Sequence, residues 1–270
     1  MSKILVNGRE TTHVDASDRG FNYGDGLFET IAVHDGRPLL WERHMERLRA
    51  GCGRLAIAVP DEDLLAREAH GLCTGLVRAV LKIIVTRGAG GRGYSPSRHD
   101  APTRVMAVYP WPEYPQRFFT DGTVLRVCRT RLASGGALAG LKHLNRLEQV
   151  LARGEWHDPD IAEGLMLDSE ERVIEGTMTN VFMVYDGELT TPDLSRAGVA
   201  GVMRGLVMDV AQQTGITCVV RDVPLQELPQ ADEIFICNSL IPVWAVKSID
   251  RWKFATGPVM RRIAQLVCKT

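Results

Sequence analysis

The stretch LAGLKHLNRLEQV, residues 138–150, places a lysine beside small and aliphatic residues, just ahead of a segment with a helical pattern. The chain has 32 basic residues, of which only six are lysines. Burial lowers the pKa of an ammonium group, and a neutral amine is the form of lysine that reacts with carbonyl carbons. Lys142 is therefore either a candidate for carbonyl chemistry or a solvated lysine at a helix start.

Upstream of this stretch, the pattern indicates strands joined by tight turns. KILVNGRETTHV (3–14) and GLFETIAVHDGRPLLW (26–41) each read as a strand, an Asn-Gly or Asp-Gly turn and a second strand. Apolar residues at helical spacing then predict a helix from Trp41 to about Leu55. The acids at 61–63 suit the start of another helix.

Three prolines and three aromatic residues in YPWPEYPQ (109–116) predict a boundary between two domains. We expect a small N-terminal domain over 1–109, a linker over 110–120 and a larger domain over 121–270. The second domain reads as strands and hairpins, with helices from about Leu144, after Gly201 and from Pro258. Because hairpins outnumber strand-helix-strand units, the predicted class is α+β with mixed sheets.

Composition excludes several kinds of partner. The net charge of -1 argues against a general affinity for nucleic acid or for anionic membranes. No apolar run approaches the roughly 18 residues of a membrane-spanning helix, and the first residues lack the pattern of a signal peptide. We therefore expect a cytoplasmic protein. Its six scattered cysteines are expected to be free thiols.

The segment GAGGRG (88–93) matches the dinucleotide pattern G-x-G-x-x-G and follows a predicted strand. A dinucleotide site also needs a helix after the glycines, and the next residues, YSPSRHDAP, contain two prolines and no helical period. We reject the nucleotide interpretation. The loop could present Arg92 and Tyr94 to a substrate carboxylate, or it could be an ordinary surface loop.

Four further stretches could carry chemistry, and each has an ordinary alternative. Arg47 lies off the apolar stripe of its helix and is by default a surface charge. Glu175 ends a strand, as an edge residue or as the partner of a cation. Gly201 precedes a helix whose free amides could hold a phosphate. Asn238 and Ser239 follow a buried strand, as a turn or as ligands.

Together these residue types match what a pyridoxal-phosphate site requires. A lysine bonds to the cofactor, a carboxylate keeps the pyridine nitrogen protonated, and arginine, amides and a hydroxyl bind the phosphate.

The sequence resembles the fold-type IV pyridoxal-phosphate enzymes, which include branched-chain and D-amino-acid aminotransferases. The general pattern appears in NYGDGLFET, HMERL, VIEGTMTNVF and AGVAGVMR, and the similarity covers nearly the whole chain. TRGAGGRGYS, LAGLKHLNRLEQVLAR and QADEIFICNSLIPV are the more specific pieces. Within this group, KHLNRLEQ is similar to the 4-amino-4-deoxychorismate lyases, which release 4-aminobenzoate and pyruvate for folate biosynthesis.

The resemblance implies roles at individual positions. Lys142 matches the lysine that forms the Schiff base, and Glu175 matches the partner of the pyridine nitrogen. The remaining cofactor-binding positions are Arg47, Val202, Met203, Asn238 and Ser239.

The resemblance also implies substrate contacts and an assembly. Thr30 matches a threonine near the 3'-oxygen of the cofactor, which makes it a candidate catalytic residue. Relatives are homodimers whose cofactor lies between two domains, and their substrate is made by aminodeoxychorismate synthase. The implied substrate-binding positions are Arg92, Tyr94, Tyr109 and Asn145.

Two other functions remain open on the sequence. An amino-acid aminotransferase would use the same lysine, carboxylate and phosphate ligands, and Gly176 after Glu175 is a glycine that aminotransferases share. A cofactor-free binding protein is the alternative from another class.

Overall fold

The computed structural model describes residues 3–96 and 101–268, and the chain forms two compact units. Unit 1 comprises Met1–Pro112 together with Lys142–Asn145. Unit 2 comprises Glu113–Leu141 and Arg146–Thr270. The division at Pro112 falls in the proline-rich segment, whereas the return of 142–145 to unit 1 was not expected.

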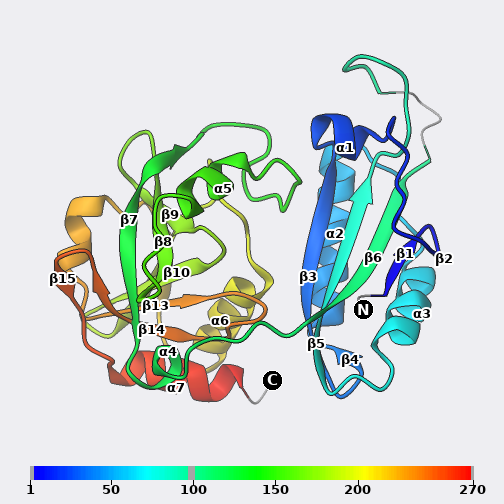
Figure 1. Ribbon diagram of the computed structural model, residues 1–270. Helices are drawn as coiled ribbons and strands as arrows, with labels where there is room; N and C mark the ends of the chain where they lie inside the picture. The colour runs from blue at the N-terminus through cyan, green and yellow to red at the C-terminus, as the bar shows by residue number, and fades with distance from the viewer. Residues whose placement is uncertain (1–2, 97–100, 269–270) are drawn as a thin grey trace. The chain divides into compact units, whose positions relative to one another are not determined.

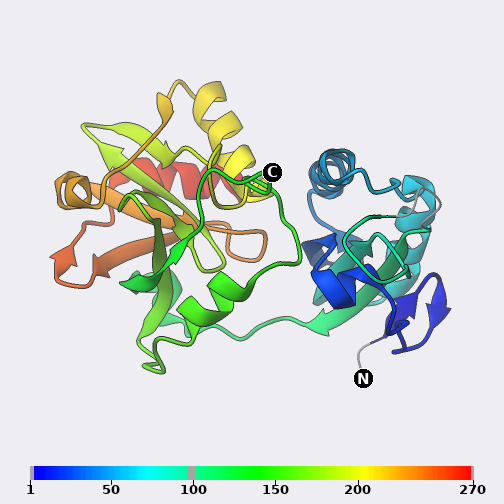
Figure 2. The same cartoon turned by 90° about the horizontal axis from the view of Figure 1, so that it is seen from above.

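Unit 1 is an antiparallel sheet with two long helices on one of its faces (Figures 1 and 2). Its six strands have the order β2-β1-β6-β5-β3-β4. The strands are β1 (Ile4–Val6), β2 (Arg9–Glu10), β3 (Gly26–His34), β4 (Arg37–Pro38), β5 (Arg78–Thr86) and β6 (Thr103–Pro110). The helices are α1 (Arg19–Tyr23), α2 (Trp41–Leu55) and α3 (Glu62–Cys73).

Turn chemistry fixes the two hairpins of unit 1. The pairs Asn7-Gly8 and Asp35-Gly36 have positive φ at both residues, with values of 50° and 81° in the first and 46° and 74° in the second. Such turns match the twist of the strands that they join, and Asn, Asp and Gly tolerate them best. The two predicted hairpins are confirmed.

The helices of unit 1 follow from amphipathic spacing and capping. In α2, Met45, Leu48 and Cys52 lie on one face and are buried. In α3, the Asp61 carboxylate accepts a hydrogen bond of 2.8 Å from the Leu64 amide and so caps the helix. Both helices begin where the sequence predicts.

Strand β3 separates two environments because successive side chains point to opposite faces. Glu29 and Ile31 are buried on the face that α2 covers. Phe28 and Thr30 are half-buried on the other face. The two faces of β3 therefore differ: Glu29 faces helix α2, whereas the candidate residue Thr30 faces away from it.

Unit 2 is a nine-stranded mixed sheet with helices packed around it (Figure 1). The strand order is β12-β11-β10-β13-β14-β7-β8-β9, and β15 pairs with β14. Three pairs are parallel: β11 with β12, β14 with β7, and β7 with β8. The strands are β7 (Thr123–Leu132), β8 (Ile161–Asp168), β9 (Val173–Gly176), β10 (Asn180–Tyr185), β11 (Glu188–Pro192), β12 (Cys218–Arg221), β13 (Glu233–Cys237), β14 (Trp244–Ile249) and β15 (Trp252–Lys253).

The described part of unit 2 contains five helical segments, and this mixture of sheets and helices confirms the predicted α+β class. They are α4 (Arg117–Thr120), α5 (Leu147–Arg153), α6 (Val202–Gln213), the 3₁₀ helix η1 (Leu225–Gln230) and α7 (Pro258–Val267). Part of the segment expected as a linker is packed into this unit. Phe118 of α4 is buried, and its ring centroid lies 5.3 Å from that of Trp244.

The helix expected from about Leu144 begins at Leu147 instead. The residues before it pair with β3: the Phe28 amide donates to the Lys142 carbonyl at 3.0 Å, and the Leu144 amide donates to the Gly26 carbonyl at 3.0 Å. These strand-like hydrogen bonds join residues far apart in sequence, so helical periodicity could not reveal them.

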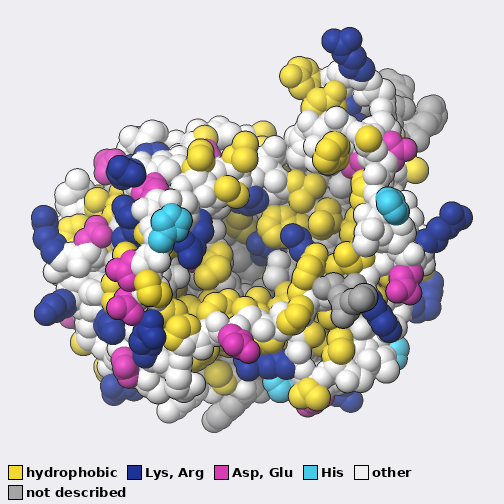
Figure 3. All heavy atoms as spheres, in the orientation of Figure 1, with side chains coloured by type: hydrophobic (Ala, Val, Ile, Leu, Met, Phe, Trp, Pro, Cys, Tyr) yellow, Lys and Arg dark blue, Asp and Glu magenta, His cyan; other side chains and the backbone are white. Residues whose placement is uncertain are grey.

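Apolar side chains also reach the surface. On α5, Leu147, Val150 and Leu151 are 75%, 63% and 64% exposed, and Figure 3 shows hydrophobic side chains over this region.

Within the described part of the chain, no helix has the length and apolar character needed to cross a membrane. All six cysteines are free thiols; four are buried, whereas Cys218 is half-buried and Cys268 is exposed.

The packing around Gly164 in β8 generates a stability prediction. An added Cβ would lie 2.4 Å from Cys128 Sγ and 2.7 Å from the Trp156 ring. We therefore expect Gly164→Ala to lower the free energy of unfolding by about 1–3 kcal/mol, the usual cost of overpacking a core. Gly71→Ala is the control, because a Cβ in this part of α3 meets open space and should stabilise the helix. Urea-induced unfolding measures both, and an unchanged Gly164→Ala midpoint would contradict the packing argument.

Candidate functional site

Lys142 of unit 1 places its amine over an aromatic ring. Its backbone carbonyl is bound to the Phe28 amide, and its Nζ lies 4.3 Å from the centroid of the Phe28 ring. Both residues are half-buried. The amine therefore lies on the open face of β3, where Thr30 is the next residue along the strand.

A second amine shares this ring. Lys82 of β5 is paired with Thr30 across the ladder, and its Nζ lies 5.4 Å from the Phe28 centroid. Strand alternation alone would let Lys82 point toward solvent. It is half-buried, and the face to which it points is the face that carries Lys142.

The opposite face of β3 holds a buried polar network. The Nδ1 of His44 lies 2.6 Å from Glu29 Oε2, and the Arg47 Nε donates to Glu29 Oε1 at 2.9 Å. Arg47 Nη2 also donates to Glu29 Oε2. The side chains of Glu29 and His44 are almost fully buried, and that of Arg47 is 15% exposed. The default interpretation of Arg47 as a solvated surface charge is therefore wrong.

This environment shifts both titrating partners. Burial alone would raise the pKa of Glu29, but the charge of Arg47 and the hydrogen bonds with His44 and Arg47 outweigh it and hold the pKa below its ordinary value. Burial lowers the pKa of His44, and the nearby charges of Arg47 and Lys142 act in the same direction against Glu29. The network therefore favours an ionised carboxylate beside a neutral imidazole.

The loop that carries Arg92 and Tyr94 is held at its backbone. Arg19 donates to the carbonyls of Gly93 at 2.9 Å and Tyr94 at 3.0 Å, and the Gly93 amide donates to the Tyr23 hydroxyl at 3.1 Å. The side chains themselves remain accessible, with Tyr94 86% exposed.

The other two expected substrate-binding residues also lie in unit 1. Tyr109 is exposed on β6. Asn145 is exposed, and its Nδ2 donates to the Gly24 carbonyl at 3.1 Å. This bond ties the end of segment 142–145 to the turn before β3.

In unit 2, Glu175 and Asn180 hold the same residue from two sides. Glu175 Oε2 accepts a hydrogen bond of 2.9 Å from the Val199 amide, and Asn180 Nδ2 donates to the Val199 carbonyl at 2.9 Å. Both side chains are buried. Glu175 therefore belongs to a fixed framework and is not a freely exposed edge residue.

The first residues of helix α6, Val202 and Met203, offer a site suited to binding an anion. Its N-cap is Gly201, no side chain caps it, and its first turn contains no acidic residue. A Cβ at Gly201 would lie 2.0 Å from Asn180 Oδ1, so the close approach of Asn180 requires glycine. A helix start of this kind offers backbone amides and a partial positive charge.

Asn238 organises the turn that presents Ser239. Its Oδ1 accepts hydrogen bonds from the amides of Leu240 and Ile241, each at 2.8 Å, and its Nδ2 donates to the Met178 carbonyl at 3.2 Å. The alternative that Asn238 forms a turn agrees with this geometry.

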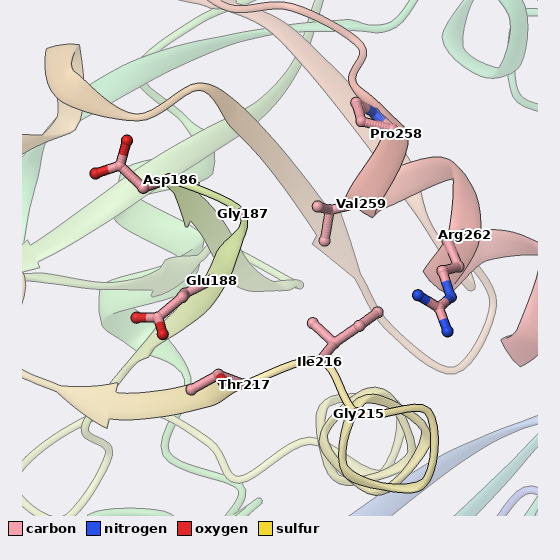
Figure 4. Close-up of a pocket in the computed structure, with 9 residues that line it drawn as sticks. All are labelled: Asp186, Gly187, Glu188, Gly215, Ile216, Thr217, Pro258, Val259 and Arg262. Atoms are coloured by element: carbon pink, nitrogen blue, oxygen red, sulfur yellow. The ribbon is translucent and has the colours of Figure 1, made fainter.

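One pocket lies on the surface of unit 2, where the β10–β11 turn meets the end of α6 and the start of α7 (Figure 4). Arg262, which borders it, donates to the Thr214 carbonyl at 3.0 Å. None of the candidate residues named above lines this pocket. Its lining residues are Asp186, Gly187, Glu188, Gly215, Ile216, Thr217, Pro258, Val259 and Arg262.

Several polar residues of this framework were not identified from the sequence. Glu29 lies in the mostly apolar segment GLFETIAV, His44 lies on the helix predicted from Trp41, and Glu163 lies inside the mostly apolar strand IAEGLMLD, which ends in a second carboxylate, Asp168. A carboxylate inside a buried strand is the signal that could have singled out Glu163, because such groups are buried only when they are paired or hydrogen-bonded.

The lowered pKa of His44 predicts a pH dependence. Because the folded protein binds this proton less readily than the unfolded chain, stability should fall as pH drops through 6.5, the ordinary pKa of histidine. Glu29 adds a loss of the same sign at lower pH, as its own depressed pKa is approached. His44→Asn retains a donor for Glu29 and does not titrate. Urea unfolding at pH 7.5 and 5.5 should therefore show a smaller pH difference for the variant than for the wild type, and equal differences would refute the assignment.

Comparisons with known proteins identify the family of this chain. Residues 26–249 match the family model described as amino-transferase class IV. The aminodeoxychorismate lyase of Vibrio harveyi is 40% identical over 262 residues, which cover 96% of this chain and 97% of the relative. A putative branched-chain-amino-acid aminotransferase of Methanocaldococcus jannaschii is 32% identical over 92% of this chain and 88% of its own length.

Solved structures show the same relationship. The crystal structure of 4-amino-4-deoxychorismate lyase from Pseudomonas aeruginosa superposes with a TM-score of 0.95 at 48% identity, covering 98% of each chain. The branched-chain amino acid aminotransferase of Escherichia coli shares the fold, with a TM-score of 0.84 at 24% identity over 98% of this chain and 92% of that one. The chain therefore belongs to the amino-transferase class IV family, which depends on pyridoxal phosphate.

Proposed function

We propose that this protein is a lyase that uses pyridoxal phosphate to convert 4-amino-4-deoxychorismate to 4-aminobenzoate and pyruvate. The observation that carries the proposal is the near full-length similarity to two proteins named for this activity, at 40% and 48% identity. The aminotransferase relatives are more distant.

The residues of unit 1 fit an amine that bonds to the cofactor. Lys142 Nζ lies against the apolar face of Phe28, and Lys82 approaches the same ring. A lysine amine must be in its neutral form to react with the carbonyl carbon of the cofactor. We assign Lys142 as the residue that attaches the cofactor and later moves the proton.

The residues of unit 2 suit the other two groups of the cofactor that need partners, which are the pyridine nitrogen and the phosphate. Glu175 is a buried carboxylate whose orientation is fixed by the Val199 amide, which suits a partner for the pyridine nitrogen. The uncapped start of α6 supplies amides of Val202 and Met203 for a phosphate. Ser239 is assigned as a hydroxyl ligand, with Asn238 shaping its turn.

Arg47 is the remaining phosphate ligand in the proposal. Its guanidinium donates to the Glu29 carboxylate, which also contacts the buried His44, so the orientation of the guanidinium is fixed. A guanidinium of fixed orientation recognises phosphate well, because less conformational freedom is lost on binding.

The reaction follows from these positions. Bound pyridoxal phosphate supplies an electron sink for the substrate carbon that bears the amino group. Lys142 Nζ removes the proton from this carbon, and Thr30, on the same strand face as Phe28, offers a hydroxyl for proton movement. Loss of the enolpyruvyl group leaves an aromatic ring, which supplies much of the driving force.

The substrate carries two carboxylates, which calls for cationic and polar partners. We assign Arg92 as a charge-assisted partner on a loop whose backbone is held by Arg19. Tyr94, Tyr109 and Asn145 complete the proposed set of substrate contacts.

We further propose a cytoplasmic homodimer that receives its substrate from aminodeoxychorismate synthase. Three exposed apolar residues of α5, Leu147, Val150 and Leu151, follow helical spacing and form one stripe. Contiguous exposed apolar surface of this kind is typical of interaction sites, and a second copy of the chain would cover it.

An aminotransferase on the same scaffold is the second candidate. Gly176, shared with aminotransferases, has a structural explanation here: a Cβ would lie 2.2 Å from Thr179 Oγ1 and 2.9 Å from the Glu163 side chain. The glycine therefore reflects local packing and is no argument for transamination.

Replacement of Lys142 tests the proposal directly. Lys142→Ala should lower lyase activity by at least about 10³-fold, equivalent to about 4 kcal/mol of barrier, and should abolish the absorbance of the bound cofactor. The backbone bond to Phe28 does not involve the side chain, so the fold should persist. Lys247→Ala, which removes a half-buried lysine of β14, is the control. Activity near the wild-type rate in Lys142→Ala would overturn the assignment.

Thr30 tests the proposed proton movement. Thr30→Val keeps the shape of the side chain and removes the hydroxyl, so 4-aminobenzoate formation should fall at least about tenfold, or about 1.4 kcal/mol of barrier. Thr30→Ser keeps the hydroxyl and should retain most activity. Steady-state kinetics, together with the cofactor absorbance, distinguish the two variants. Equal rates for both would mean that Thr30 serves only to pack the strand.

A further inference from the structure

Glu163 of β8 is a buried carboxylate to which the proposed reaction gives no role. It is 1% exposed, yet it accepts five hydrogen bonds. One comes from the amide of its neighbour Gly164, and the other four come from residues 177–179. The carboxylate is therefore the centre around which this short loop is folded.

The individual bonds hold the loop at each of its residues. Oε1 accepts from the Thr177 amide at 3.1 Å and from the Thr177 hydroxyl at 2.5 Å. Oε2 accepts from the Met178 amide at 3.1 Å and from the Thr179 hydroxyl at 3.1 Å. Gly176 directly precedes the loop. Only glycine fits at this position, because Thr179 and Glu163 occupy the space that a Cβ would need.

The residues that flank this loop, Glu175 and Asn180, are the two whose side chains bind the backbone of Val199. Glu175 lies just before Gly176 in β9 and binds the Val199 amide, while Asn180 opens β10 and binds the Val199 carbonyl. The same Asn180 packs against Gly201, the N-cap of α6. The conformation of the loop therefore sets the spacing between Glu175 and the start of α6.

The middle of the loop reaches the remaining turn of unit 2. The Met178 carbonyl accepts from Asn238 Nδ2 at 3.2 Å, and Asn238 shapes the turn that carries Ser239. Through the 177–179 loop, the Glu163 carboxylate is thus connected to Glu175, to the start of α6 and to the turn that carries Ser239.

Burial of Glu163 opposes its ionisation. Burial raises the pKa of Glu163, although the hydrogen bonds from Thr177, Gly164, Met178 and Thr179 oppose the rise. An acid whose folded pKa is raised loses stability when it ionises, because the unfolded chain releases the proton more readily.

We infer that Glu163 is a positioning residue, which shapes the 177–179 loop and through it aligns Glu175 and the start of α6 for the cofactor. The inference rests on the proposed function for the roles of Glu175, Val202 and Met203. Glu163 itself touches neither cofactor nor substrate in this assignment.

The test compares two buried carboxylates of unit 2. Glu163→Gln keeps the size of the side chain but replaces one acceptor oxygen with an NH2 donor. This donor would face a donor group of the loop, so that hydrogen bonds are lost. Glu233→Gln is the matched control, because Glu233 is also buried and accepts two backbone amides, those of Val259 and Met260 at the start of α7. Circular dichroism selects a temperature at which both variants are folded.

Two measurements follow, hydrogen exchange in the cofactor-free protein and the dissociation constant of pyridoxal phosphate. For Glu163→Gln we expect faster exchange of the Thr177, Met178 and Val199 amides and a dissociation constant raised at least about tenfold. For Glu233→Gln we expect faster exchange at Val259 and Met260 and a dissociation constant within about twofold of wild type.

Unchanged exchange at residues 177–178 in Glu163→Gln, or equal losses of cofactor affinity in the two variants, would overturn the inference. Failure of the proposed function has a different signature. In that case the wild-type protein itself would not bind pyridoxal phosphate, while the exchange result for Glu163→Gln would be unaffected.

Discussion

The backbone of Val199 is bound at both of its polar groups, by Glu175 at the amide and by Asn180 at the carbonyl, and the candidate residues of unit 2 depend on this pair of hydrogen bonds. The two side chains come from β9 and β10, which are consecutive in the chain, and lie on either side of one short loop. Because a buried backbone group without a partner is costly, the three residues constrain one another. A carboxylate and an uncapped helix start are thereby held in a fixed relation before any ligand binds. Such preorganisation lowers the entropy lost on binding.

Unit 1 depends on the two-sided geometry of β3 in the same way. Glu29 points to the helix-covered face and orients Arg47, while Phe28 and Thr30 point to the open face, beside Lys142. Segment 142–145 joins this strand through backbone hydrogen bonds. The position of Lys142 is therefore fixed by a main-chain hydrogen bond that does not involve its side chain.

Local patterns predicted much of this structure, and long-range contacts explain what they missed. The Asn7-Gly8 and Asp35-Gly36 turns, the spacing of α2 and the start of α7 at Pro258 are properties of short stretches, so they can be read from sequence. The late start of α5, the half-buried position of Lys82 and the network around Arg47 each depend on a partner far along the chain. Apolar neighbours marked Lys142 and a strand end marked Glu175 as candidates with ordinary alternatives, and only the family resemblance gave them roles. Glu163, a carboxylate inside a buried strand, was not singled out. Their roles in binding remain predictions.

The most direct test of the account is the reaction preference of the purified protein loaded with pyridoxal phosphate. The kcat/KM for release of 4-aminobenzoate from 4-amino-4-deoxychorismate is compared with that for amino-group transfer from D-alanine or a branched-chain amino acid to a keto acid. The account predicts that the lyase reaction is faster by at least about a hundredfold, a difference typical of a site built for one substrate. Efficient amino-group transfer without formation of 4-aminobenzoate would contradict it.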